Sequence, residues 1–275
     1  MADLYLSEIF VYPIKSLGGI SLQAAEVEDR GLRYDRRWML VDGKGHFLTQ
    51  RKHAQMALLQ VSLQEDGLLV SHKQGLLEPL YIPFEEEHVR QNELQVTVWE
   101  DTVQALEVNA STSAWFSKAL GMPARLVRMP QESHRLVDPD YAAHGELVSF
   151  ADGYPFLIIG QASLGDLNSR LDSPVPMNRF RPNFVFRGGR PFEEDSWKSF
   201  SIGGVKFHAV KPCARCVLTT IDQQTAEKGA EPLRTLASYR LVNNKVMFGQ
   251  NLLHTGTGPV QVGDRIEVHE WQQKL

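Results

Sequence analysis

Residues 211–220, KPCARCVLTT, hold the only two cysteines of this 275-residue chain, Cys213 and Cys216, at a C-x-x-C spacing. A proline precedes the pair, an arginine lies inside it, and an apolar, β-branched run follows. The sequence on both sides, including residues 217–222 (VLTTID), has the character of β-strands. We therefore predict that the two thiols lie where the chain turns between strands.

Four chemistries are compatible with this pair. A thioredoxin-like dithiol belongs at a strand-to-helix junction, whereas VLTTID predicts a strand. A structural zinc site needs four N or S ligands, and the chain has no second C-x-x-C and no H-x-x-x-H. The thiols could also be two small buried apolar groups, or one thiolate could bind a soft metal centre that a cofactor carries. Lys211 and Arg215 favour a thiolate, but the spacing alone leaves these alternatives open.

The composition limits the class of protein. Hydrophobic residues make up 43% and charged residues 23% of the chain, which is typical of a soluble globular protein. The net charge of −4 argues against nucleic-acid or anionic-membrane partners, whose binders usually carry a basic surplus. The amino terminus does not resemble a signal peptide, and no run of about 18 apolar residues could span a membrane. With so few cysteines, we expect a reducing, cytoplasmic location.

Short apolar runs dominate the first 108 residues. Pairs of such runs flank residues 42–45 (DGKG), 64–67 (QEDG) and 100–102 (EDT), each of which predicts a hairpin turn. Hairpins at this short spacing indicate a β-sheet or a barrel.

Helices and one long loop interrupt the strands. We predict helices over 109–120, over 163–171 with Ser163 as the cap, and over 231–239. Residues 130–148 are polar and contain two prolines. They predict a long loop that crosses between domains and could act as a lid.

Several polar residues stand beside glycine or proline. Lys15 and Ser16 lie in a glycine-bearing turn and could hold an anion. Residues 30–37 (RGLRYDRR) form a local cationic focus, and Arg181 precedes a proline that fixes the backbone. Asp152 lies in a turn before a buried strand. Each also has an ordinary explanation, as a solvated side chain, a salt bridge or a turn-forming aspartate.

Six motifs in order along nearly the whole chain carry a resemblance to a known family. They are VYPIKSL (11–17), YDRRW (34–38), SFADGYPFLI (149–158), FRPN (180–183), KPCARCVLTT (211–220) and FGQNL (248–252). Together they resemble the MOSC family, which is named after the carboxy-terminal domain of molybdenum cofactor sulfurase. Within it, the chain resembles bacterial YcbX proteins and the mitochondrial amidoxime-reducing component.

The resemblance implies a fold and a cofactor. The fold would be α+β and β-rich, with a β-barrel-like amino-terminal domain over 1–122 and a β-barrel MOSC domain over 123–271. A molybdenum–molybdopterin cofactor is expected in the cleft between the two domains. Neither zinc nor pyridoxal phosphate is expected.

The resemblance also assigns residues to this cofactor. In the family the second cysteine of the C-x-x-C stretch ligates molybdenum, and that position is Cys216. Lys15, Ser16, Arg36 and Arg181 are expected around the anionic cofactor. Further contacts are expected from Asp152, Gly153, Tyr154, Cys213, Ala214 and Asn251.

The activity implied is the reduction of N-hydroxylated bases and amidoximes to amines and amidines, a detoxification reaction. Cys216 and Asp152 are the expected catalytic residues, with Asp152 orienting a metal-bound oxygen or relaying a proton. Longer relatives carry a two-iron ferredoxin domain, for which the present sequence has no cysteines. Electrons are therefore expected from a separate flavoprotein or ferredoxin-type protein. The alternatives are a non-enzymatic carrier of cofactor or sulfur on Cys216, and a dithiol redox protein that uses Cys213 with Cys216.

Overall fold

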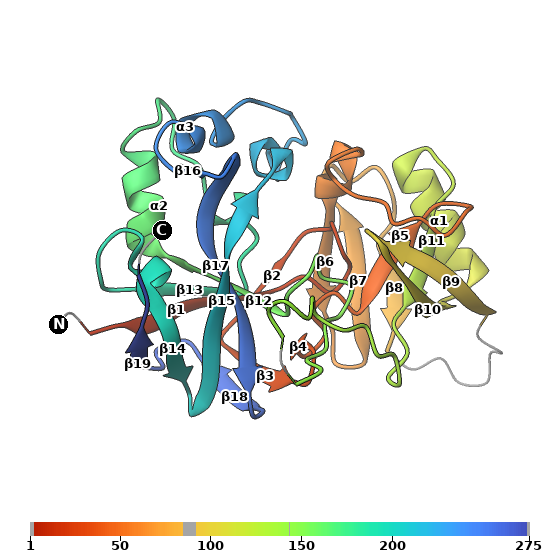
Figure 1. Ribbon diagram of the computed structural model, residues 1–275. Coiled ribbons are helices and arrows are strands. Elements are labelled where there is room, and N and C mark those ends of the chain that lie inside the picture. The colour runs from red at the N-terminus through yellow and green to blue at the C-terminus, as the bar shows by residue number, and fades with distance from the viewer. Residues whose placement is uncertain (1–2, 85–91, 143, 274–275) are drawn as a thin grey trace.

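The computed structural model describes residues 3–84, 92–142 and 144–273, and it consists of two β-rich halves that lie side by side (Figure 1). Helix α1 (Ala110–Leu120) covers one half, and α2 (Gln161–Asn168) and α3 (Leu233–Ala237) cover the other. Strand β1 (Tyr5–Val11) departs from the order of the chain, because it lies among the strands of the carboxy-terminal half. The β-rich α+β fold predicted from the sequence is confirmed.

A nine-stranded sheet forms the carboxy-terminal half. Its order is β19-β14-β15-β17-β12-β13-β1-β2, with β16 paired to β17, and only β12 and β13 run parallel. The Leu6 N–H donates to the Asp264 carbonyl, and the Ile266 N–H donates to the Leu4 carbonyl, each at 2.8 Å. These bonds join the start of β1 to the chain before β19. The expected barrel is therefore an open sheet whose ends meet through a few backbone hydrogen bonds. The remaining strands of this sheet are β2 (Ile20–Leu22), β12 (Phe156–Gly160), β13 (Phe184–Arg187), β14 (Trp197–Ile202), β15 (Val205–Arg215), β16 (Leu241–Val242), β17 (Lys245–Thr255) and β19 (Ile266–Trp271).

Three smaller sheets complete the fold. A four-stranded sheet has the order β5-β11-β10-β9, and a three-stranded sheet has the order β6-β7-β8. The third sheet, β18-β3-β4, pairs a strand near the carboxy terminus with two near the amino terminus, and Val27, Leu32 and Val260 from it pack in the same core as the nine-stranded sheet. Their strands are β3 (Ala24–Glu28), β4 (Gly31–Leu32), β5 (Trp38–Val41), β6 (Leu59–Leu63), β7 (Gly67–His72), β8 (Leu80–Pro83), β9 (Asn92–Val98), β10 (Asp101–Glu107), β11 (Arg125–Arg128) and β18 (Gly258–Gln261).

Strand pairing crosses the predicted domain boundary at residue 122. Strand β11 begins at Arg125, yet it pairs with β5 and β10 of the amino-terminal half. Conversely, β1 pairs with β13, so that Ile9 lies opposite Phe184. The boundary stays a prediction, but the strands on either side of it are exchanged between the halves.

The observed helices agree with the predicted ones best at α1, whose first and last residues have ordinary capping contacts. Asn109 Oδ1 accepts a 2.8 Å hydrogen bond from the Thr112 N–H, and Gly121 ends α1 with φ of 65°. Ser163 was predicted to cap α2, but that helix begins at Gln161, because the Ser163 hydroxyl donates instead to the buried Glu194 carboxylate at 2.8 Å. Helix α3 covers only the centre of its predicted range.

The segment after the cysteines is not a strand. Strand β15 ends at Arg215, and residues 217–220 form the 3-10 helix η4 (Val217–Thr220). The Thr219 hydroxyl donates to the Cys216 carbonyl at 3.0 Å, and the Thr220 hydroxyl donates to the Val217 carbonyl at 2.8 Å. The prediction was wrong because these hydroxyls satisfy the carbonyls locally and so favour a tight turn over a sheet ladder. The other 3-10 turns are η1 (Ala54–Leu58), η2 (Met177–Arg179) and η3 (Glu193–Ser196).

Buried polar contacts fasten the two halves beside this turn. Gln50 is fully buried, and its amide donates to the Ser16 carbonyl at 2.7 Å. The Gln223 amide, from the carboxy-terminal half, donates to Gln50 Oε1 at 3.0 Å. Because buried amides hold one geometry only when they are paired, this contact fixes the loop that carries the next residue, Arg51.

Candidate functional site

A cavity of about 130 Å³ lies where the two halves meet, and we call it the inner cavity. The turn before β12, the turn η4 and strand β17 contribute its carboxy-terminal wall. Arg36 and Arg51 reach it from the amino-terminal half. The thiol of Cys216 lines it as well, so that one cysteine meets residues from both halves of the molecule.

Positive charge dominates the inner cavity. Its lining contains the four arginines Arg36, Arg51, Arg181 and Arg215, but only one carboxylate, that of Asp152. Burial lowers the pKa of Arg181 to about 10, and the nearby charge of Arg36 acts in the same direction, although Tyr12, Asp35 and Asp152 oppose it. Such a cluster of buried cations is suited to an anionic ligand.

The ring of Tyr12 supports two of these arginines. The Arg36 and Arg181 guanidinium carbons lie 4.4 Å and 4.2 Å from its ring centroid. Arg36 Nη1 also donates to Asp35 at 2.6 Å and to Asn183 Oδ1 at 3.2 Å. Burial raises the pKa of Tyr12 to about 12, so its ring stays neutral and serves as a face for the cations.

Four of the nine described non-glycine residues with positive φ are found near this place, and the other five lie elsewhere. Ser16, Arg36, Trp99 and Arg181 have φ values of 67°, 49°, 58° and 55°, in the left-handed region that favours glycine. A non-glycine residue there costs on the order of 1–3 kcal/mol, and such costs are typical of functional sites. All four residues lie in or beside the inner cavity or the pocket next to it.

Asp152 is at the centre of a hydrogen-bond network. Its carboxylate accepts from Lys15 Nζ at 2.6 Å, from Arg51 Nη2 at 2.7 Å and from the Trp99 indole at 3.2 Å. Loss of hydration opposes ionisation of the Asp152 carboxyl group. The charges of Lys15 and Arg51 nevertheless hold the pKa of Asp152 well below its usual range. Asp152 is therefore a fixed carboxylate at neutral pH.

Lys15 shows the opposite balance. Its side chain is buried and donates to the Phe150 carbonyl at 2.7 Å in addition to Asp152. Burial lowers the pKa of Lys15 from 10.5 to about 8, although Asp152 opposes this effect. Lys15 can therefore gain or lose a proton near physiological pH, whereas Asp152 cannot.

Each cysteine has its own arginine. Arg51 Nε donates to the Cys216 sulfur at 3.1 Å, and Arg215 Nη1 donates to the Cys213 sulfur at 2.9 Å. Both thiols are free. Cys213 packs against the core under β12 and β13 and does not line the inner cavity. The C-x-x-C spacing thus places one thiol in the cavity and one against the core.

The residues predicted from the sequence divide into two groups. Those that line the inner cavity are Arg36, Asp152, Gly153, Tyr154, Arg181, Cys216 and Asn251. Those that do not line it are Lys15, Ser16, Cys213 and Ala214. Lys15 lies one hydrogen bond behind the cavity through Asp152, and the Ser16 carbonyl accepts from Gln50. Their roles in ligand binding stay predictions.

The arginine-rich stretch 30–37 is mostly not part of the site. Arg30 pairs with Asp29, and Arg33 and Arg37 pair with Glu28 on the outside of the cavity. Only Arg36 reaches the cavity. The expected cationic focus was wrong for the other three, because acidic residues just before the stretch neutralise them.

Arg51 is the main residue that the sequence did not reveal. It follows the run HFLTQ with no motif around it. Its guanidinium links Cys216 to Asp152 and lies 4.6 Å from the Trp99 ring centroid. Only the buried contact of Gln50 explains why this arginine points into the site.

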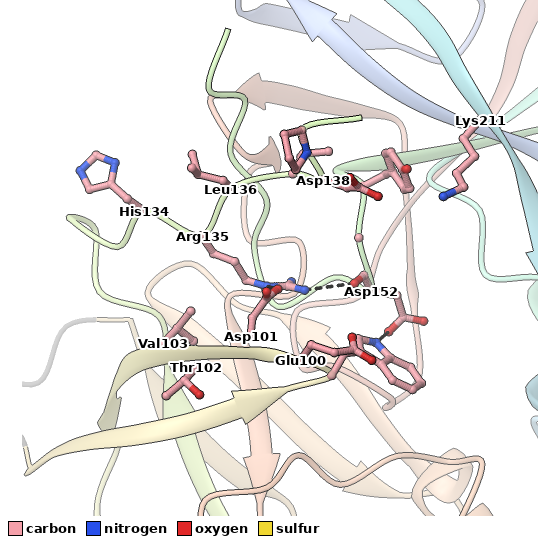
Figure 2. Close-up of a pocket in the computed structure, with 15 residues that line it drawn as sticks. Glu100, Asp101, Thr102, Val103, His134, Arg135, Leu136, Asp138, Asp152 and Lys211 are labelled. Atoms are coloured by element: carbon pink, nitrogen blue, oxygen red, sulfur yellow. Dashed lines mark hydrogen bonds and ion pairs between the residues drawn. The ribbon is translucent and has the colours of Figure 1, made fainter. Parts of the chain in front are cut away.

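A second, larger pocket of about 760 Å³ adjoins the inner cavity, and we call it the outer pocket (Figure 2). The two share residues 152–154. The turn between β9 and β10, the segment 134–139 and Lys211 of β15 complete its lining. Figure 2 shows Arg135 between Asp101 and Asp152; its guanidinium donates to the Asp101 carboxylate at 2.8 Å and to the Asp152 carbonyl at 3.0 Å. The loop predicted as a lid therefore supplies one wall.

Comparison with known proteins identifies the family. Residues 3–123 match the MOSC N-terminal beta barrel domain, and residues 146–267 match the MOSC domain. The chain belongs to the MOSC family. It is 34% identical to mitochondrial amidoxime-reducing component 1 of Mus musculus, covering 95% of this chain and 81% of that protein.

Two further MOSC relatives have related names. The Homo sapiens amidoxime-reducing component 1 is 32% identical, covering 95% of this chain and 82% of that protein. The molybdenum cofactor sulfurase of Oryza sativa subsp. japonica is 33% identical, covering 90% of this chain but 32% of that protein. The resemblance inferred from the six motifs is confirmed, and it connects the chain with the molybdenum cofactor.

The described residues contain neither a cluster of metal ligands nor a membrane-spanning helix. Within residues 3–84, 92–142 and 144–273, no group of three or more His, Cys, Asp or Glu side chains could hold a metal ion. No helix in this part of the chain is long and apolar enough to cross a membrane.

Proposed function

We propose that this MOSC protein is a molybdenum-cofactor-dependent reductase of N-hydroxylated bases and amidoximes, with Cys216 as the molybdenum ligand. The observation that carries the proposal is the inner cavity, where one cysteine thiol meets four arginines. A thiolate suits a soft metal, and arginines suit a phosphate. Molybdopterin, which carries a dithiolene for the metal and a phosphate, needs both.

Unpaired polar atoms support the fit of this cofactor. The Arg215 Nε and the Tyr154 hydroxyl are buried, belong to residues of the lining, and have no hydrogen-bond partner among the residues that the structure describes. Leaving such atoms unpaired costs free energy, so they favour a ligand with acceptors. The cationic lining and the single thiol agree with this requirement, and Arg36, Arg181 and Arg215 would hold the anionic group.

The reaction consumes two electrons and two protons, which convert an N–OH group to N–H and release water. When bound, the cofactor supplies the two-electron chemistry, and a separate electron-donor protein restores it. The protein's own residues hold the site. Arg51 holds the Cys216 sulfur in place, and Asp152 holds Arg51 and Lys15.

The protons require a group that titrates near neutral pH. We expected Asp152 to relay them, but Lys15 and Arg51 keep its pKa well below its usual range despite burial. Lys15, with a pKa lowered by burial to about 8, is the better proton donor. In this proposal Asp152 stays ionised and holds Lys15 and Arg51 in place, and Lys15 is the group that can give up a proton.

A non-enzymatic carrier of cofactor or sulfur is the second candidate. The similarity to about a third of a molybdenum cofactor sulfurase favours it, because that protein's name refers to sulfur and the cofactor and not to reduction of a substrate. Cys216 would then carry the transferred group. A dithiol redox protein is less well supported, because each thiol contacts a different arginine and Cys213 packs against the core.

One experiment separates these candidates. The protein and its Cys216→Ser and Cys213→Ser variants are purified from a host that makes molybdopterin, and molybdenum per chain is measured. Reduction of benzamidoxime is then followed with a chemical or protein electron donor. We expect about one molybdenum per chain and turnover in the wild type and in Cys213→Ser, with both lost in Cys216→Ser. Bound molybdenum without turnover would favour the carrier, and wild-type turnover in Cys216→Ser would refute the reductase proposal.

A further inference from the structure

The outer pocket has features that the cofactor does not explain. Trp99 lies in its lining, where the side chain is 40% exposed. The residue occupies the two-residue turn between β9, which ends at Val98, and β10, which begins at Asp101. A large aromatic side chain is unusual in such a turn, where glycine, asparagine and aspartate dominate.

The backbone of Trp99 shows that the indole is held in place at a cost. Its φ is 58°, a conformation that strains a bulky residue. The indole N–H donates to Asp152 at 3.2 Å, and the ring contacts Phe47 with 5.1 Å between centroids. These contacts fix the ring at the junction of the outer pocket and the inner cavity. Because the Arg51 guanidinium already lies over the ring, the stacking surface that remains for a flat ligand is the exposed part of the indole.

Charges of both signs lie around this indole, because the Arg51 guanidinium lies 4.6 Å from its ring centroid and Lys211 lines the same pocket. Glu100 and Asp138 line the outer pocket and form no ion pair with any of the described residues. In Figure 2 the segment that carries Asp138 lies across the pocket from Glu100. Asp101 is already paired with Arg135, and the Lys211 ammonium lies 4.0 Å from the Tyr141 ring centroid. The carboxylates that remain available therefore favour a cation, in contrast to the inner cavity.

We propose that the outer pocket binds the part of the substrate remote from the N–O bond, and that it selects planar organic cations by stacking on Trp99 and by the carboxylates of Glu100 and Asp138. Two independent features support the same ligand chemistry, since an indole face and a carboxylate both attract a delocalised positive charge. The volume of about 760 Å³ is that of a small-molecule site. The substrate class is then an N-hydroxylated compound whose planar group carries positive charge. As a statement about substrates, this inference rests on the proposed reductase function.

Binding can be tested without turnover. The probes are benzamidine, a planar cation with no N–O bond, and benzamide, its uncharged counterpart of similar shape. Titration calorimetry on molybdenum-loaded protein should show benzamidine binding about tenfold more tightly than benzamide, with the preference reduced by added salt. Equal affinity for the two probes, or no binding of either, would overturn the proposal.

Variants locate the site. Trp99→Asn keeps a residue that tolerates the backbone conformation but removes the ring, and it should weaken both probes about fivefold. Glu100→Gln combined with Asp138→Asn should weaken benzamidine about three- to tenfold and leave benzamide within about twofold. Trp271→Ala and Glu267→Gln are the matched controls, because both residues lie on β19 outside the pocket. If the controls act as strongly as the pocket variants, the pocket is not the site.

The outcome is separable from that of the proposed function. A protein that prefers benzamidine in the predicted manner but reduces no N-hydroxylated compound would refute the reductase and keep the cation pocket. A protein that reduces such compounds with equal KM for charged and neutral members of a series would support the reductase and refute the cation pocket. Within a working enzyme, the Glu100/Asp138 double variant should raise KM for cationic substrates alone and leave kcat unchanged.

Discussion

The inner cavity and the outer pocket are neighbours of opposite charge. The inner cavity has four arginines and one carboxylate, whereas the unpaired groups of the outer pocket include Glu100 and Asp138. Asp152 belongs to both and is held by cations from the inner side. Two of the inner arginines, Arg36 and Arg181, are largely buried and lie on strained backbone, whereas Glu100 and Asp138 of the outer pocket are exposed. This difference leads us to expect that removing a paired charge from the inner cavity lowers the free energy of unfolding strongly. Removing a carboxylate from the outer pocket should lower it only slightly.

The largest effect is expected from Arg36→Met. Arg36 Nη1 lies 2.6 Å from the Asp35 carboxylate, which is 1% exposed. The variant would leave that carboxylate buried and unpaired, so the free energy of unfolding should fall by about 3–5 kcal/mol. Chemical denaturation measures this loss.

Arg33→Met provides the control, because the Arg33 side chain is 54% exposed and pairs with Glu28 at the surface. It should cost less than about 1 kcal/mol. Similar losses in both variants would show that the inner charges are no more coupled to the fold than surface charges.

Arg181→Met should separate ligand binding from folding. Arg181 is buried and its pKa is lowered to about 10 by that burial, so the folded protein gains little from its charge. The free energy of unfolding should change by less than about 1 kcal/mol, whereas cofactor affinity should fall about ten- to a hundredfold. Molybdenum retained per chain during dialysis measures the second effect. If the variant retains as much molybdenum as the wild type, Arg181 does not bind the anionic cofactor.

Lys15 should make stability depend on pH. Burial lowers its pKa from 10.5 to about 8, so between these values the unfolded chain binds more protons than the folded one. Stability therefore rises with pH through this window, and the gain from pH 7 to pH 9 should be about 1.4 kcal/mol larger in the wild type than in Lys15→Met. Denaturation of both proteins at the two pH values measures it. If the stability of both proteins changed equally with pH, the pKa of Lys15 would not be lowered in the folded protein.

The smallest effect is expected from Asp101→Asn in the outer pocket. The Asp101 side chain is 49% exposed, although its partner Arg135 is buried. Arg135 keeps hydrogen bonds to the carbonyls of Ser149, Ala151 and Asp152, so the loss should be below about 1 kcal/mol. The midpoint of thermal unfolding is the measurement. If the free energy of unfolding fell by several kcal/mol, charges in the outer pocket would matter as much for stability as those in the inner cavity.

Local patterns predicted the hairpins and the first helix, because their information lies within a few residues. The hairpin expected around residues 100–102 is present, but its turn lies one position earlier, at Trp99-Glu100, between two strands of seven residues. The motifs that carried the family resemblance also placed Arg36, Arg181 and Cys216 in one cavity. These are cases in which the neighbouring sequence determines the conformation.

Long-range contacts could not be predicted in this way. Arg51 reaches Cys216 across 165 residues, and nothing near it in the sequence signals that contact. The segment after Cys216 has strand-like composition, but its threonines bond to local carbonyls. The charge of stretch 30–37 was misleading because Glu28 and Asp29, outside the motif, neutralise most of it.

The position of β1 has a consequence for how the chain is made. Its residues pair with β13, about 180 residues later, and with the backbone of residues 263–266. During synthesis from the amino terminus, β1 can pair with β2 early, but its pairing with β13 and its bonds to residues 263–266 must wait until those later residues have left the ribosome. The carboxy-terminal sheet should therefore form late and slowly, because its first and last strands close a loop of nearly the full chain length. A chaperone that covers the nascent amino terminus would act on β1 for most of that time.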